Sequence, residues 1–132
     1  MKEENELNLS NEALLGSSTT MNLSYKQFEF LKDVCTLIQH VANKGWKVTG
    51  GELDRTIEQQ KIYFESGKSK TMESLHLDRL AIDLNFFNPE GELTYKKKDL
   101  QWIGDFWESL SPQNEWGGNW EFTDTPHFQR NK

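Results

Sequence analysis

The segment from Leu80 to Phe86 places the strongest constraint on the fold of this chain. It is apolar at every position except Asp83 and Asn85, a pattern that suits a strand in the middle of a sheet. A carboxylate in such a strand is strongly unfavourable unless it is paired with a cation or bound to a metal. The sequence therefore predicts a functional role for Asp83.

Two histidines and a second carboxylate are candidates to act with Asp83. His76 precedes Asp83 by seven residues, and the segment Asp124-Thr125-Pro126-His127-Phe128 adds another histidine and a spare carboxylate. A catalytic zinc site needs three protein ligands and one open position for water. His76, Asp83 and His127 are therefore candidate metal ligands.

The spacing of these residues leaves an alternative open. A His and an Asp seven residues apart often occur by chance, and the short zinc motif of two histidines four apart on a helix is absent. Judged by spacing alone, two ordinary histidines hydrogen-bonded near strand ends are slightly favoured over a metal site.

Composition narrows the class of protein. The 132 residues, of which 35% are hydrophobic, suffice for one domain with a core. A net charge of −6 argues against nucleic acid as a partner, because nucleic-acid binding needs clustered Lys and Arg. No apolar run is long enough for membrane insertion, and the acidic N-terminus has no apolar signal-peptide core. We expect a monomer made in the cytoplasm, with any export by a separate route.

One helical pattern contains the single cysteine. Apolar residues alternate at spacings of three and four along one stripe: Phe28, Leu31, Cys35, Ile38 and Ala42. A second group widens the stripe: Val34, Leu37 and Val41. Because free Cys is usually buried, we expect Cys35 to lie in the core, and with only one cysteine no internal disulfide is possible.

The remaining patterns predict an α+β fold, with a small antiparallel sheet that carries the metal site and packs against helices. Residues 1–22 read as a flexible N-terminal extension, and residues 23–132 as one domain. The expected elements, in chain order, are a helix after a capping box at 24–27, a strand at 46–49 that continues at 52–55 beyond Gly50-Gly51, a helix from a second capping box at 56–59 to Ser66-Gly67, the strand 80–86, a short strand at 92–95, a helix capped by Asp99 and running to Leu110, and a strand at 127–129.

Four groups of residues, taken in order, resemble one known family. They are Arg55-Thr56-x-x-Gln59-Gln60-x-x-Tyr63-x-x-x-Gly67, then Ser74-x-His76 leading to Ala81-x-Asp83, then Gly117-Gly118-x-Trp120, and finally Asp124-x-Pro126-His127-Phe128. This order is similar to that of the zinc peptidase family of D-alanyl-D-alanine carboxypeptidases and L-alanyl-D-glutamate endopeptidases, which includes phage endolysins. The resemblance extends from about Trp46 to Phe128.

The resemblance implies a role for each matched residue. It makes His76, Asp83 and His127 the ligands of one zinc ion per chain. It makes Asp124 the general base and Arg55 the residue that polarises the scissile carbonyl. It assigns substrate binding or orientation to four further residues: Ser74, Tyr63, Ser69 and Thr71.

The implied activity is hydrolysis of an amide bond in the stem peptide of peptidoglycan, at the cell wall. By analogy with small phage lysins, an L-alanyl-D-glutamate endopeptidase is preferred to a D-alanyl-D-alanine carboxypeptidase. A zinc-containing module that binds a wall peptide or a partner protein without turnover is the rival, as is a zinc-stabilised structural part of a phage particle or secreted effector. Asp124 and Arg55 favour the enzyme, because a binding module does not need both.

Some positions carry an alternative or depart from the family pattern. Arg55 could form a surface ion pair with Glu52 or Asp54 instead of acting in catalysis. Trp116 and Trp120 are expected to pack within the protein rather than to stack on a substrate. The family usually has Gly three residues after the first histidine, where this chain has Arg79. Gly permits a positive φ at such a place, so Arg79 puts the shape of the loop in doubt.

Overall fold

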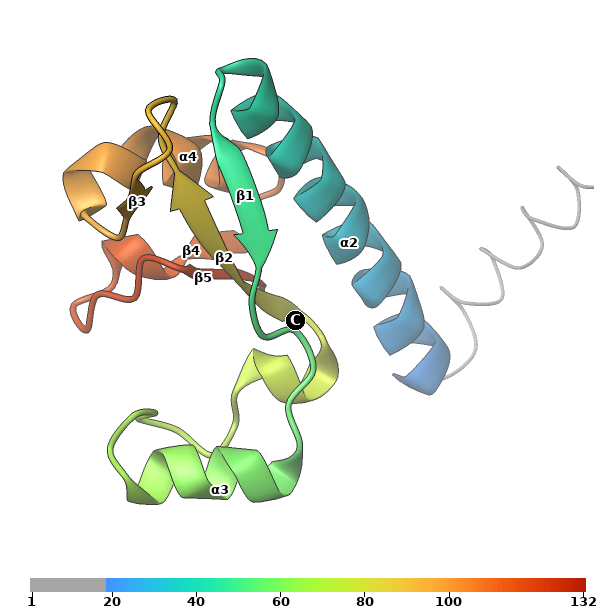
Figure 1. Ribbon diagram of the computed structural model, residues 1–132. Coiled ribbons are helices and arrows are strands. Elements are labelled where there is room, and N and C mark those ends of the chain that lie inside the picture. Colours follow the sequence, from blue (N-terminus) through green and yellow to red (C-terminus); the bar gives the residue numbers. More distant parts are fainter. Residues whose placement is uncertain (1–18) are drawn as a thin grey trace, which may run out of the picture.

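The computed structural model describes residues 19–132, and in it helices pack against one antiparallel sheet (Figure 1). Most of the predicted extension, residues 1–22, lies outside the described residues, so its character stays a prediction. The predicted α+β class, with a small antiparallel sheet that carries the candidate site, is confirmed. No helix within residues 19–132 combines the length and apolar character needed to span a bilayer.

The sheet is built around two central strands. Its order is β1-β2-β5-β4, and the strands are β1 Lys47–Gly50, β2 Ala81–Phe87, β5 His127–Arg130 and β4 Asn114–Trp116. The short strand β3, Leu93–Thr94, also pairs with β2. The first half of β2 pairs with β5 and its second half with β1, so β2 links both parts of the sheet.

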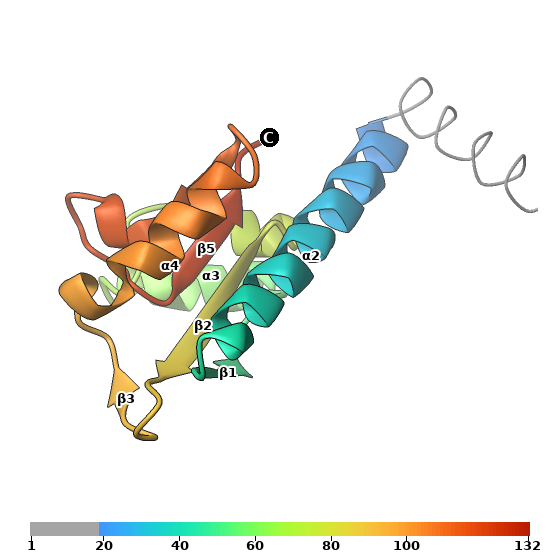
Figure 2. The same cartoon turned by 90° about the horizontal axis from the view of Figure 1, so that it is seen from above.

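The two faces of β2 have different roles. Leu84 and Phe86 are each 1% exposed and belong to the hydrophobic core. Asp83 and Asn85 alternate with them and therefore point to the opposite face. Helices α2 (Thr19–Asn43) and α4 (Lys97–Ser109) cover the core face (Figure 2). Helix α3 (Ile57–Glu65) lies past the end of β1 and the start of β2 (Figure 1). The prediction of a central strand around Asp83 is confirmed.

The first helix begins earlier than its predicted cap. α2 starts at Thr19, so Ser24 lies inside the helix and the capping box predicted there is wrong. Residues 19–22, assigned from the sequence to the extension, are helical. A serine and a glutamine three residues apart satisfy the pattern equally well inside a helix, where the backbone N–H groups already have partners.

Only part of the apolar face predicted for α2 is buried. The side chains that enter the core are Phe30, Val34, Leu37 and Val41. The stripe predicted to be central is exposed, with Phe28 59%, Leu31 50% and Ile38 38% accessible, and Cys35 is exposed too. The expectation of a buried Cys35 is therefore wrong. Apolar residues cover two adjacent stripes of this helix, and only contact with the rest of the domain decides which stripe is buried.

Helix α3 is preceded by a segment without regular structure that stays hydrogen-bonded to β2. The Thr56 hydroxyl accepts a hydrogen bond from the Gln59 backbone N–H, which confirms the predicted N-cap. The strand predicted at 52–55 is wrong, because those residues form no regular strand. The chain nevertheless stays bonded to β2 there: Gly51 N donates to Asp83 O at 2.7 Å, and Asp83 N donates to Glu52 O at 2.8 Å.

The third helix completes the core. α4 begins two residues before Asp99, which lies in its first turn and does not cap it. Gly104 on α4 leaves room for the Trp116 ring, since a Cβ there would lie 2.1 Å from it. Trp116 is fully buried, as expected, and belongs to β4, a strand that the sequence did not predict.

Candidate metal centre and active-site cleft

The pairing of β2 with β5 brings two of the three candidate ligands together. Asp83 lies directly opposite His127 in the antiparallel register. Directly opposite residues place their side chains on the same face of a sheet, a few ångströms apart. The distance from Asp83 Oδ1 to His127 Nδ1 is 3.7 Å. Backbone hydrogen bonding therefore positions this pair.

The third candidate ligand comes from a short 3-10 helix, η1, Leu75–Asp78. The Ser74 hydroxyl caps it by accepting from the His76 backbone N–H at 3.2 Å. Arg79 ends it in the left-handed conformation, with φ 54° and ψ 39°. The chain thus keeps the positive φ that Gly would favour, without the glycine, and enters β2 directly. His76 Nε2 lies 3.4 Å from Asp83 Oδ1.

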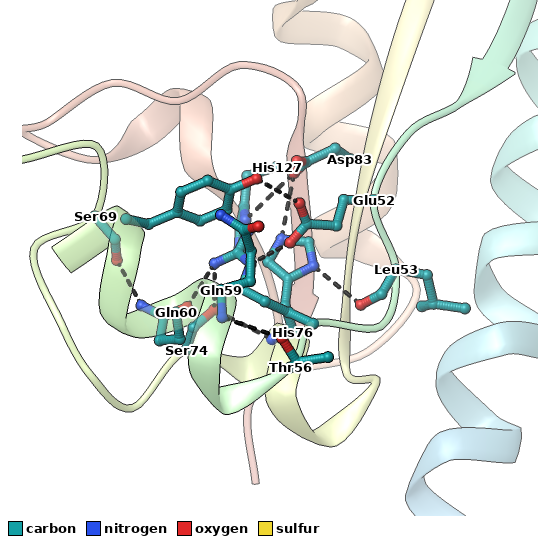
Figure 3. Close-up of polar contacts among 12 residues, drawn as sticks. Glu52, Leu53, Thr56, Gln59, Gln60, Ser69, Ser74, His76, Asp83 and His127 are labelled. Carbon is teal, nitrogen blue, oxygen red and sulfur yellow. Dashed lines mark hydrogen bonds and ion pairs between the residues drawn. The ribbon is translucent and has the colours of Figure 1, made fainter. Parts of the chain in front are cut away.

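Hydrogen bonds fix which nitrogen of each ring faces the centre. His76 Nδ1 lies 3.1 Å from the Leu53 carbonyl oxygen, which can only accept, so Nδ1 carries the proton and the Nε2 lone pair faces Asp83. His127 Nε2 lies 2.7 Å from Gln129 Oε1, which leaves Nδ1 facing Asp83 and Asp124. Figure 3 shows both rings turned toward Asp83.

The donor set fits a metal ion. One ligand atom from each of His76, Asp83 and His127 lies within 4.8 Å of the others. His76 Nε2 and Asp83 Oδ1 are buried and have no hydrogen-bond partner among residues 19–132. A lone pair and a carboxylate oxygen facing each other repel, and leaving such buried atoms unpaired costs about 1–3 kcal/mol each. A divalent cation between them removes both penalties, and two imidazoles with one carboxylate are ligands that zinc accepts.

The two carboxylates of the cleft have opposite pKa shifts. Burial alone would raise the pKa of Asp83, but a proton on the facing nitrogen of His127 or His76, standing where a metal cation would bind, outweighs burial and holds the pKa well below its usual value. Burial raises the pKa of Asp124 and outweighs the nearby His127, His76 and Arg55, which lower it, while the charge of Asp83 adds to the rise. Asp83 is therefore suited to binding a cation as an anion, and Asp124 to accepting a proton.

Asp124 reaches the centre through a tight turn around Gly117. Asp124 N donates to Gly117 O at 2.9 Å, and His127 N donates to Asp124 O at 3.1 Å. A Cβ on Gly117 would lie 2.4 Å from Asp124 O, so only glycine fits there. Asp124 Oδ2 lies 4.0 Å from His127 Nδ1, with 43% of the Asp124 side chain exposed to the cleft.

Arg55 faces the same centre from the opposite side. Its Nε pairs with Glu52, and its Nη1 donates to Gln60 Oε1 at 2.7 Å and to Ser74 Oγ at 3.2 Å. The ion pair with Glu52 considered from the sequence is thus present, but it is not a surface pair, because the Arg55 side chain is only 10% exposed. These bonds hold the guanidinium group rigidly beside the cleft.

Gln60 is a functional residue whose role the sequence reasoning missed. It is fully buried, accepts from Arg55, and donates through Nε2 to Ser69 Oγ at 2.9 Å and to Thr71 O. It therefore joins Arg55 to the loop after α3. Tyr63 is linked to the same group, because its hydroxyl donates to Glu52 Oε2 at 3.2 Å. A buried glutamine needs partners on both its ends.

All nine residues singled out from the sequence line one cleft, with a volume of about 710 Å³. They are Arg55, Tyr63, Ser69, Thr71, Ser74, His76, Asp83, Asp124 and His127. The structure thus brings them together, while their individual roles stay predictions. The cleft also includes residues that were not singled out for it: Lys68, Lys70, Trp120, Phe122 and Gln129. Trp120, expected only to pack, lines the cleft with its ring centroid 4.8 Å from that of His127.

Comparison with known proteins gives a consistent result. Residues 67–130 match a family model described as D-alanyl-D-alanine carboxypeptidase. The L-alanyl-D-glutamate peptidase of Listeria phage A118 is 35% identical over an alignment of 101 residues that covers 72% of this chain. Residues 67–130 of this chain therefore belong to that peptidase family. The matched region includes the three candidate ligands and Asp124.

A solved structure has the same fold as this chain. The L-Ala D-Glu endopeptidase ChiX of Serratia marcescens superposes with a TM-score of 0.63 and 22% identity, over 92% of this chain and 86% of that one. The phage relative is much longer, and the match covers 34% of its length.

Proposed function

We propose that this chain is a zinc-dependent peptidase that hydrolyses the L-alanyl-D-glutamate bond in the stem peptide of peptidoglycan. The observation that carries the proposal is a pair of buried atoms beside His127, His76 Nε2 and Asp83 Oδ1, which have no hydrogen-bond partner among residues 19–132. Their position beside Asp124 and opposite Arg55 in one cleft supports hydrolysis rather than binding alone. The names of the phage and Serratia relatives support the choice of bond.

One zinc ion per chain would be held by His76, Asp83 and His127. When bound, zinc supplies a Lewis acid that makes water acidic enough to be deprotonated at neutral pH. Asp124 is the residue we assign as proton acceptor. Burial raises its pKa, which makes it a stronger base than an exposed aspartate, and the proton that it takes up can then pass to the leaving amine.

Arg55 is the residue we assign to the developing negative charge on the scissile carbonyl oxygen. Its hydrogen bonds use Nε and Nη1, and no residue within 19–132 accepts from Nη2. A preorganised cationic donor of this kind stabilises the transition state without reorganising during the reaction. Ser74 orients both Arg55 and His76 in this proposal, since its hydroxyl accepts from each.

The loop after α3 is the proposed substrate contact, and its charge suits an acidic peptide. Lys68 Nζ lies 4.4 Å from the Tyr63 ring centroid, and Lys70 Nζ lies 5.1 Å from that of Phe122. Both ammonium groups are therefore held at the cleft. Ser69 and Thr71 shape this loop, because Ser69 Oγ donates to Thr71 O at 3.1 Å. A stem peptide carries carboxylates that these lysines would attract.

The deciding experiment is digestion of a synthetic stem peptide that contains both an L-alanyl-D-glutamate bond and a C-terminal D-alanyl-D-alanine. We expect mass spectrometry to show release of L-alanine from the N-terminal side, in the presence of zinc only. Release of the terminal D-alanine would instead identify a carboxypeptidase, the activity that the family description favours. Zinc binding and peptide binding without any product would identify a binding module.

Peptidoglycan is the proposed partner, and the cell wall the proposed place of action. The active unit would be a monomer, with residues 1–22 as an extension. Size-exclusion chromatography with light scattering tests the monomer, and a variant without residues 1–18 tests whether the domain alone cuts the peptide.

A further inference from the structure

Three polar side chains lie on one face of the C-terminal segment, behind the proposed metal ligand His127. His127, Gln129 and Asn131 alternate along the chain, a spacing that points them to the same side of a strand. Glu115 on β4 lies directly opposite Gln129 in the register. Neither the proposed chemistry nor the core uses Gln129, Asn131 or Glu115.

These four residues form a continuous series of hydrogen bonds. His127 Nε2 lies 2.7 Å from Gln129 Oε1. Gln129 Nε2 donates to Asn131 Oδ1 at 2.7 Å, and Asn131 Nδ2 donates to Glu115 Oε2 at 2.9 Å. The second oxygen of Glu115 accepts from the indole N–H of Trp120. The series therefore ends at a carboxylate that is itself held in place.

The direction of the series follows from that carboxylate. An ionised Glu115 can only accept, so the amide nitrogen of Asn131 must face it. The Asn131 oxygen then faces Gln129, which turns the Gln129 nitrogen toward Asn131 and the Gln129 oxygen toward His127. An amide oxygen can only accept, so His127 must carry a proton on Nε2. The neutral ring then has its lone pair on Nδ1, which faces the proposed metal position.

Two carboxylates on the other side of the ring favour the opposite tautomer, with the proton on Nδ1. Asp83 Oδ1 and Asp124 Oδ2 lie 3.7 and 4.0 Å from His127 Nδ1, and either carboxylate would accept a proton from it. A proton on Nδ1 would block the atom that has to bind the metal. An acceptor fixed at Nε2 favours the tautomer and the ring orientation that leave Nδ1 free.

We propose that Gln129, Asn131 and Glu115 are positioning residues that fix the tautomer of His127 and aim its Nδ1 at the metal. The proposal rests on the metal site of the proposed function. Such groups behind a metal ligand typically change metal affinity by about 10–100-fold when removed. Glu115, at the far end, sets the direction of every bond in the series.

A matched pair of substitutions at one position isolates the acceptor. Gln129→Met and Gln129→Glu both remove the amide nitrogen that faces Asn131, but only the glutamate retains an oxygen for His127. We expect Gln129→Met to weaken zinc binding by about 10–100-fold and Gln129→Glu to stay within a few fold of the parent chain. Competition with a chromophoric zinc chelator measures both, and Glu121→Gln, an exposed carboxylate outside the series, is the control.

The tautomer itself is read from the metal-free protein. Nitrogen-15 shifts of the His127 ring, recorded at about pH 9 where an ordinary histidine is neutral, distinguish a proton on Nε2 from one on Nδ1. We expect the Nε2-protonated form in the parent chain and in Gln129→Glu. A growing share of the Nδ1-protonated form is expected in Gln129→Met, with a smaller shift in Glu115→Gln, whose amide can face Asn131 in either orientation.

Equal zinc affinity and an unchanged tautomer in Gln129→Met would overturn the proposal, as would Gln129→Glu behaving like Gln129→Met. Its failure is distinct from failure of the proposed function. A parent chain that binds zinc but cuts no peptide still tests the series through affinity. A parent chain that binds no zinc refutes the metal site, and the ring shifts then decide whether the series sets the tautomer.

Discussion

The two walls of the cleft are built in different ways. On the sheet wall, Asp83 and His127 face each other because β2 and β5 pair in register, so main-chain hydrogen bonds position them. The other wall, called the helix wall below, consists of Arg55 and the residues around the start of α3 that hold it. There the Arg55 side chain is fixed by its own bonds to Glu52, Gln60 and Ser74. One wall depends on backbone pairing and the other on a network of individual side chains.

This difference predicts which property a substitution on each wall should change. A side chain on the sheet wall can be replaced without moving the strands, so the loss is confined to the metal. On the helix wall each side chain holds another, and a single replacement loosens several groups. Metal affinity should therefore report on the sheet wall, and turnover at full metal occupancy should report on the helix wall.

The largest effect is expected from His127→Ala on the sheet wall. It removes one of three proposed ligands, so bound zinc and peptide hydrolysis should both be lost, while the sheet stays paired. Elemental analysis after dialysis and circular dichroism measure the two properties. Retention of about one zinc per chain in this variant would show that His127 is not a ligand.

Asp124→Asn should separate metal binding from chemistry. We expect zinc content to be retained and turnover to fall by about 10²–10⁴-fold, the usual contribution of a general base. Burial raises the pKa of Asp124 in the folded chain above its value in the unfolded chain. At a pH above both values the ionised Asp124 therefore lowers the stability of the folded chain. At neutral pH the metal-free variant should therefore be no less stable than the parent chain, which thermal unfolding can check. Near-normal turnover would mean that another group accepts the proton.

Gln60→Met tests the helix wall away from the metal. The buried methionine cannot bond to Arg55 or to the loop, so we expect turnover to fall by about tenfold and stability by about 1–3 kcal/mol, with zinc affinity unchanged. Peptide kinetics at saturating zinc and urea unfolding give these quantities. A change in zinc affinity as large as the change in turnover would show that the two walls are not independent.

Arg79→Gly should have the smallest effect, and it should raise the stability of the folded chain, whereas Gln60→Met lowers it. Arg79 has a φ of 54°, a conformation that costs a non-glycine residue about 1 kcal/mol. Glycine relieves that strain but also gains freedom in the unfolded chain, so the net stabilisation should be below 1 kcal/mol. Urea unfolding measures it. Clear destabilisation would mean that the Arg79 side chain contributes more than its backbone costs.

The sequence was most informative where a residue conflicted with its surroundings. Asp83 stands alone in an apolar segment, and this conflict identified both the central strand and the centre of the cleft. It was least informative where two patterns were equally consistent. Both apolar stripes of α2 satisfy helical spacing, and contact with α4 and the sheet selects the one that contains Leu37 instead of Cys35.

Two other misses have physical reasons. Strand β4 has three residues and two of them are polar, so neither its length nor its alternation indicates a strand. The hydrogen-bonded residues behind His127 did leave a signal, because Gln129 lies two residues further on the strand predicted at 127–129 and Asn131 continues the same interval beyond it. Gln60 left none of that kind, since its burial depends on a loop whose path the sequence does not specify.

The register of β2 against β5 also constrains the order in which the molecule can fold. Ala81 pairs with Gln129 and Asp83 with His127, so the centre of the sheet joins segments that are far apart along the chain. Contacts of long sequence separation form slowly and late, because a large loop must close first. On the ribosome, the metal site cannot assemble until residues 127–130 have emerged. A chain truncated before residue 127 should therefore bind no zinc and be inactive.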